Sequence, residues 1–158
     1  MTDQTMQETR YVTYIATTPQ QCWQALTSAD YTSRYFFGRR IEGEWKVGAA
    51  WTMHKPDGQI DVHGQVRECD PPRKLVLSWI VAWAPDIPEC LVRYEIEAVG
   101  EHAVRLTMTE AHPTSIAEAL LEGGRRGWPM ILSGLKTLLE TGKPLVLPLP
   151  QPPKEMQK

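Results

Sequence analysis

The most regular pattern of apolar residues lies near the C-terminus, between Trp128 and Glu140. Its apolar positions recur with the i, i+3, i+4, i+7 spacing of one helical face. Gly142 and Pro144 follow, which is typical of a helix end, because glycine adopts positive φ readily and proline prevents continuation. The pattern predicts a helix over 128–140 with one apolar face. Pro129 is expected either in its first turn or at a kink in a longer helix.

Period-two alternation dominates from residue 41 to residue 110. It places Ile60 and Val66 on one face of their strand, and Trp83 on the inward face of the most apolar run. Strands are predicted over 41–45, 49–54, 59–69, 73–83, 89–98 and 103–110. The turn signals between them are short, so neighbouring strands should be antiparallel.

The remaining segments are shorter. A β-rich run predicts a first strand over 10–17, and Thr18-Pro19 starts a helix over 19–27. A second short helix should end at Tyr35. Another is expected from His112 to Glu122, loosened by the glycines of 123–127 before the long helix.

The order of these elements predicts one α+β domain over residues 9–143. About six to seven antiparallel strands should form a curved sheet around the long C-terminal helix, because nothing else is large enough to cover that helix's apolar face. Residues 1–8 are polar and expected to be disordered, and residues 144–158 should form a proline-rich, extended tail.

Composition narrows the function. The 17 basic and 19 acidic residues are well mixed, which argues against nucleic acid as a partner. No stretch is long enough for membrane insertion. The three cysteines form no CxxC pair and the N-terminus lacks a signal-peptide pattern, so a cytoplasmic location is expected.

Several stretches together resemble a known superfamily. They are Thr18–Thr27, Val47-Gly48, His63–Trp79, Val104–Glu110 and Gly127–Gly142. In this order they resemble the START-like or SRPBCC superfamily, within it the branch homologous to the C-terminal domain of the heat-shock-protein-90 ATPase activator. The resemblance implies a helix-grip fold. It leaves function open, because the superfamily includes lipid carriers, hydrophobic-ligand binders, polyketide cyclases and co-chaperone-like modules.

A helix-grip fold encloses space between sheet and helix, and aromatic side chains of this chain should face it. We therefore predict binding of a small hydrophobic molecule, lipid-, polyketide- or flavonoid-like, with Glu110 or Tyr94 as the polar contact. The alternative is that the same side chains simply fill a core. The predicted ligand-binding residues are Trp51, Met53, Trp79, Val81, Trp83, Tyr94, Met108, Glu110, Trp128, Ile131, Leu132 and Leu135.

Glu110 is the strongest single candidate for a functional residue, because alternation places this carboxyl group on the apolar face of its strand. It would orient a ligand hydroxyl or act as acid and base in a cyclase- or dehydratase-like enzyme; alternatively, it lies solvated at the strand end or caps the next helix near Thr114. No hydrolase, phosphate-loop or dinucleotide motif is present, so no catalytic residue is assigned and nothing requires an enzyme.

The histidines, the aromatic residues near position 35 and the tail bear on metals and on protein partners. His54 and His63 flank a turn and count outward as cross-strand neighbours, with no HxH or HxxxH pair, so neither a metal nor another cofactor is expected. Arg34, Tyr35 and Phe36 would rim a cavity mouth or seal a helix end. A third function, a protein-interaction module resembling a chaperone ATPase activator, would bind a partner through an exposed face, for example the tail at 145–150, and would have a filled interior. A homodimer or another protein partner stays open.

Overall fold

The structure is a computed structural model that describes residues 6–113 and 118–147. The described elements are, in chain order, β1 (Met6–Ile15), α1 (Pro19–Thr27), α2 (Ala29–Tyr35), β2 (Arg40–Gly43), β3 (Ala50–His54), β4 (Ile60–Asp70), β5 (Lys74–Val81), β6 (Cys90–Val99), β7 (Ala103–Pro113) and α3 (Glu118–Thr141).

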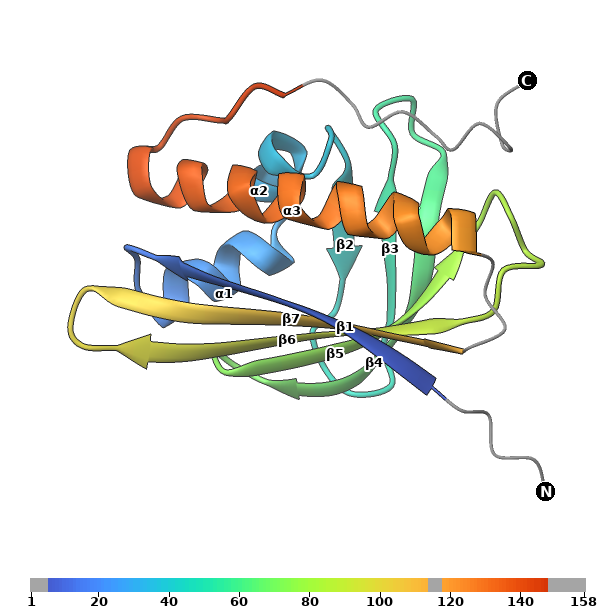
Figure 1. The fold of residues 1–158 in the computed structure, drawn as a ribbon, viewed down its shortest axis with the longest axis horizontal. Helices are drawn as coiled ribbons and strands as arrows, with labels where there is room; N and C mark the ends of the chain where they lie inside the picture. Colours follow the sequence, from blue (N-terminus) through green and yellow to red (C-terminus); the bar gives the residue numbers. More distant parts are fainter. Residues whose placement is uncertain (1–5, 114–117, 148–158) are drawn as a thin grey trace.

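The strands form one antiparallel sheet in the order β1-β7-β6-β5-β4-β3-β2. The sheet curves around α3, so that β1, β7, β6 and β5 lie beneath the helix while β2 and β3 rise behind it (Figure 1). The helices α1 and α2 fill the space near the C-terminal end of α3. The predicted α+β helix-grip architecture is therefore confirmed.

The long helix α3 is longer than the pattern of apolar residues indicated. The glycines at 123, 124 and 127 do not interrupt it, and Pro129 lies inside it. Glycine costs roughly 1 kcal/mol per position relative to alanine in a helix, a penalty that burial of an apolar face can outweigh. The prediction of a separate short helix from His112 is wrong, because β7 continues to Pro113, which pairs with Met6.

The strand β1 also begins earlier than expected. Residues 6–8, assigned from the sequence to a disordered N-terminus, pair with residues 111–113 of β7. Residues 144–147 of the tail run without regular structure from the end of α3. The prediction for the rest of the tail, and for residues 1–5, lies outside the described residues.

Period-two counting fails at two places, Trp83 and Ile60. Trp83 was expected to face inward but is 56% exposed, because β5 ends at Val81 and the chain turns before it. Ile60 is exposed because the register shifts between Met53 and His54, which reverses the alternation. His54 pairs with Ile60, and His63 with Thr52, so the two histidines are not cross-strand partners.

Candidate functional site

The sheet brings one carboxyl group into an apolar row. Leu77 on β5 lies beside Val92 on β6, and Val92 lies beside Glu110 on β7. Leu77 and Val92 are fully buried. The predicted placement of Glu110 on the apolar face of its strand therefore agrees with the register of the sheet.

Four aromatic rings pack against one another between the sheet, α2 and α3. The ring of Trp79 lies 5.0 Å from Trp51, 5.7 Å from Trp128 and 6.3 Å from Phe36, measured between centroids. Phe36 meets Trp128 edge to face at 5.5 Å. These separations are typical of favourable aromatic pairs. We call Phe36, Trp51, Trp79 and Trp128 the aromatic cluster.

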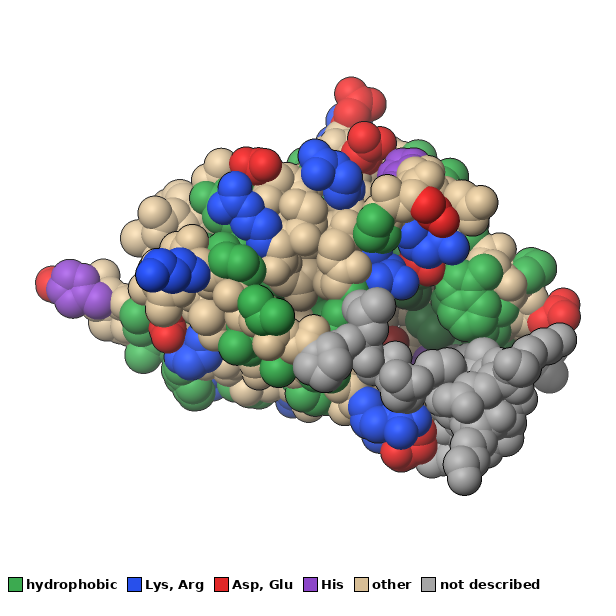
Figure 2. All heavy atoms as spheres, turned by 90° about the horizontal axis from the view of Figure 1, so that it is seen from above, with side chains coloured by type: hydrophobic (Ala, Val, Ile, Leu, Met, Phe, Trp, Pro, Cys, Tyr) green, Lys and Arg blue, Asp and Glu red, His purple; other side chains and the backbone are tan. Residues whose placement is uncertain are grey.

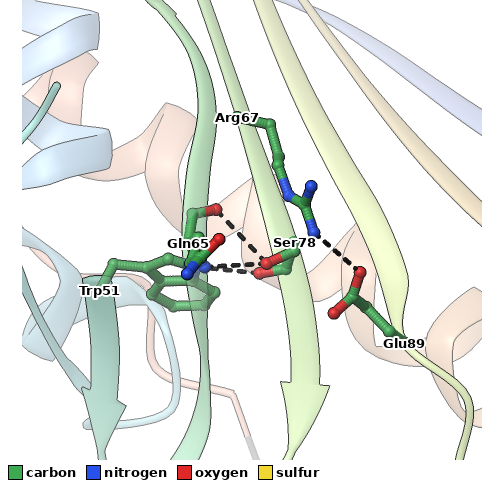
Figure 3. A network of polar contacts seen from close by, with 5 residues as sticks. All are labelled: Trp51, Gln65, Arg67, Ser78 and Glu89. Carbon is green, nitrogen blue, oxygen red and sulfur yellow. Dashed lines mark hydrogen bonds and ion pairs between the residues drawn. The ribbon is translucent and has the colours of Figure 1, made fainter. Parts of the chain in front are cut away.

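A polar network on β4 and β5 fixes the position of Trp51. Its indole Nε1 donates to the carbonyl oxygen of Ser78 at 2.9 Å, and the backbone N–H of Gln65 donates to Ser78 Oγ at 2.8 Å (Figure 3). A Cβ on Gly64 would lie 2.0 Å from the Ser78 carbonyl oxygen, so only glycine fits there. Arg67 and Glu89 form an ion pair of 3.2 Å beside this network, with both side chains largely exposed.

Glu110 lies at the edge of the aromatic cluster. Trp128 Nε1 donates to its Oε2 at 3.4 Å, which is long for a hydrogen bond. Burial raises the pKa of Glu110, and the Trp128 hydrogen bond and the nearby His112 only partly offset this. On α3, a Cβ on Gly124 would lie 3.3 Å from Glu110 Oε1, so the helix backbone approaches the carboxyl group closely here.

Further buried polar groups surround Glu110. Among the described residues, Tyr11 Oη and both ring nitrogens of His112 are buried without a hydrogen-bond partner. Burial, and then the Glu110 charge, raises the pKa of Tyr11 and of Tyr94. Burial and the same charge raise the pKa of the Cys90 thiol to about 11, so it is a neutral group. We call Tyr11, Tyr94, Glu110 and His112 the Glu110 cluster.

Most of the predicted binding residues share one interior. All except Glu110 and Trp83 belong to the core or pack against it. Trp83 lies outside this interior. Tyr11 and His112 were not among the predicted binding residues, although counting by two from Glu110 leads directly to His112. Phe36 was predicted only to rim a cavity mouth or seal a helix end, whereas its ring belongs to the aromatic cluster.

Two surface pockets lie on the helix side, away from the aromatic cluster. One, of about 370 Å³, lies between α1, α2 and the end of α3, beside Gln21, Arg34 and Leu138. The other, of about 230 Å³, lies between α2, α3 and the tail, beside Tyr35 and Leu147. None of the predicted binding residues lines either pocket.

In the part of the chain that the structure describes, neither surface charge nor the arrangement of metal-binding side chains indicates a second site. Seen from the α3 side, basic and acidic side chains are interspersed (Figure 2). Within the described ranges, no three His, Cys, Asp or Glu side chains are grouped to hold a metal ion. Of the helices the structure describes, none combines the length and apolar character needed to cross a membrane.

An antiparallel sheet gripping a long C-terminal helix over an aromatic interior defines a START-like helix-grip protein. The model of one family within this class, described as activator of Hsp90 ATPase homolog 1-like protein, matches residues 16–140. The chain belongs to that family. No curated protein sequence matches it.

Solved structures share the fold at low identity. An HSP90 activator from Plasmodium falciparum is 23% identical over 84% of this chain and 95% of its own, with a TM-score of 0.71. The Aha1 dimer from Colwellia psychrerythraea is 21% identical over 86% and 98%, with a TM-score of 0.68. DynU16, a protein in the dynemicin biosynthetic locus, is 22% identical over 87% of this chain and 48% of its own, with a TM-score of 0.72.

Proposed function

We propose that this protein binds a small, flat, apolar molecule between the sheet and α3, next to Glu110. The observation that carries the proposal is the Glu110 cluster. It places a carboxyl group, a phenol and an imidazole in an apolar interior where the described residues leave the phenol oxygen and both imidazole nitrogens unpaired.

Unpaired buried polar groups are costly, at roughly 1–3 kcal/mol each. A ligand hydroxyl or carbonyl that hydrogen-bonds to Tyr11, Glu110 or His112 would remove part of this cost. Burial of about 200 Å² of apolar ligand surface would contribute roughly 5 kcal/mol before the cost of association. The two terms together favour a ligand with a flat apolar body and one polar edge.

The guest enters by moving Trp128, since the aromatic cluster fills the centre of the grip. The long Trp128–Glu110 hydrogen bond is the weak contact that would be exchanged for one to the ligand. On the same part of α3, a Cβ on Gly123 or Gly127 would meet no described atom within 4 Å, so the space beside the helix is open at these two positions.

The test is a tryptophan-fluorescence titration with flavonoids and fatty acids. A flavonoid that binds beside Trp79 and Trp128 should quench the emission, and Glu110→Gln should weaken its binding roughly five- to tenfold, the value of about one ordinary hydrogen bond. Glu97→Gln on the exposed end of β6 is the matched control and should bind as wild type. If no compound changes the emission, or if Glu110→Gln binds every ligand unchanged, the proposal is wrong.

Catalysis is a second candidate, supported by the raised pKa of Glu110. A carboxyl group that holds its proton closer to neutral pH is suited to act as acid and base in a cyclisation or dehydration. The Glu110→Gln variant separates the two functions: it should abolish turnover in an enzyme but only weaken binding in a carrier.

Protein interaction is a third candidate, supported by the exposed Leu145, Val146 and Leu147 of the tail. One relative is named as an HSP90 activator and another as a dimer, so a chaperone or a second copy is the partner to test. Deleting residues 144–158 should abolish binding to a chaperone, and unchanged binding would exclude the tail. The described cysteines are all unpaired, which fits the expected cytoplasmic location.

A further inference from the structure

The strand β1 is an edge of the sheet that is protected at only one end. Its sole strand neighbour in the described sheet is β7. Near its C-terminal end, Lys136 of α3 donates to the Tyr14 carbonyl, and the Ala16 N–H donates to Glu140 at 2.9 Å. Among the described residues, no hydrogen bond reaches the outer edge of β1 before Tyr14.

Alternation along the strand identifies which groups this edge presents. The Tyr14 carbonyl bonds to Lys136 on α3, away from β7, and backbone direction repeats every second residue in an antiparallel strand. The N–H and C=O groups of Glu8, Arg10 and Val12 therefore point away from β7 as well. Unpaired edges of this kind are templates for a further strand.

We propose that a second copy of this chain occupies the edge, with the two β1 strands antiparallel and Glu8 opposite the partner's Arg10. A two-fold axis at Thr9 then generates the same pair twice. Antiparallel pairing requires that residues with outward-pointing backbone groups face each other, and both Glu8 and Arg10 have them.

The charges of Glu8 and Arg10 favour this register over the two registers shifted by two residues. Moving the strands by two residues in one direction places Glu8 opposite the partner's Glu8, and in the other direction places Arg10 opposite the partner's Arg10. Like charges directly opposite each other destabilise a strand pair, and opposite charges stabilise it. Within one chain Glu8 and Arg10 are 4.0 Å apart, so four alternating charges would lie together across the axis.

Apolar contacts agree with the same register. It places Met6, 41% exposed, opposite the partner's Val12, which is 51% exposed. The two-fold axis generates this Met6–Val12 pair twice, and in each pair the two side chains would cover one another on the outer face of the sheet. Beyond Val12 the pairing ends, because Lys136 already bonds to the Tyr14 carbonyl.

The test is the mass of the full chain by light scattering and sedimentation over a micromolar dilution series. Wild type should be dimeric. Glu8→Arg or Arg10→Glu alone should raise the dimer dissociation constant at least about tenfold, since each places like charges opposite each other twice. The double swap Glu8→Arg with Arg10→Glu should restore the dimer. Glu101→Arg, a reversal at a fully exposed hairpin, is the matched control and should leave it unchanged.

A second variant tests the backbone contacts alone. Val12→Pro removes an outward N–H that β7 does not use, so the fold should persist, with an unchanged circular dichroism spectrum, while the dimer is lost. A monomeric wild type refutes the proposal. So does a dimer that survives both single charge reversals, or one that the double swap fails to restore.

Discussion

The substitution Gly64→Ala tests the close approach of β4 and β5 directly. The backbone φ of Gly64 is one that any residue can adopt, so glycine is required here only because there is no space for a Cβ. An added Cβ would lie 2.0 Å from the carbonyl oxygen and 2.7 Å from the carbonyl carbon of Ser78. That oxygen also accepts the Trp51 Nε1 hydrogen bond, so any movement of β5 disturbs the aromatic cluster as well.

The expected cost is large for one methyl group. An ordinary van der Waals contact to a Cβ begins at 3.4 Å, so the strands must separate by more than an ångström. Overpacking costs roughly 1–3 kcal/mol where flexible side chains yield, and more where backbone must move. We therefore expect a loss of about 3 kcal/mol or more in the free energy of unfolding, which lowers Tm by roughly 6–12 °C in a chain of this size.

Urea unfolding monitored by circular dichroism measures this loss. Gly123→Ala is the matched control, because its Cβ meets no described atom within 4 Å and alanine is the better helix former. It should stabilise the protein by roughly 0.5–1 kcal/mol. If Gly64→Ala unfolds within 1 kcal/mol of wild type, the close approach of the two strands is not as described.

Other substitutions test the site and a helix end. Burial raises the folded-state pKa of Glu110, so its contribution to stability is present below the unfolded value of about 4.3 and is lost as pH rises through the folded pKa. The stability of Glu110→Gln relative to wild type should therefore increase as the pH rises above about 4 in urea titrations, and a constant difference would contradict this. Thr18 Oγ1 accepts from the Gln21 N–H at 3.1 Å, so Thr18→Ala should cost about 1 kcal/mol in the same assay, and an unchanged midpoint would refute a capping role. Lys136→Met removes the bond to the Tyr14 carbonyl and should increase hydrogen exchange at the end of β1, whereas unchanged exchange would show that the bond does not protect that end.

The sequence was sufficient for the architecture because its signals are periodic. The apolar face from Trp128 to Leu138 has one helical solution, and the alternating strands with short turns have one antiparallel solution. The signal failed where backbone register departs from strict alternation. The shift beside His54 turned Ile60 outward, and no property of the residues themselves predicts a register shift.

The site was less predictable for a different reason. Counting by two placed Glu110 on the inner face, but the extension of β7 through His112 depends on pairing with residues more than a hundred positions earlier in the chain. Local propensity favoured a helix start at His112-Pro113, and tertiary pairing overrode it. Whether aromatic side chains fill a space or line it depends on packing that no sequence pattern encodes.

The pairing of β1 with β7 has a consequence for biosynthesis. Ile15 lies beside Val104, and Met6 beside Pro113, so β1 has no neighbour in the sheet until β7 has been synthesised. During that interval its Tyr11, Val12 and Tyr14 are available to whatever they encounter, including other nascent chains. Slow codons or a holding chaperone acting before residue 113 would therefore act while β1 still lacks its partner strand.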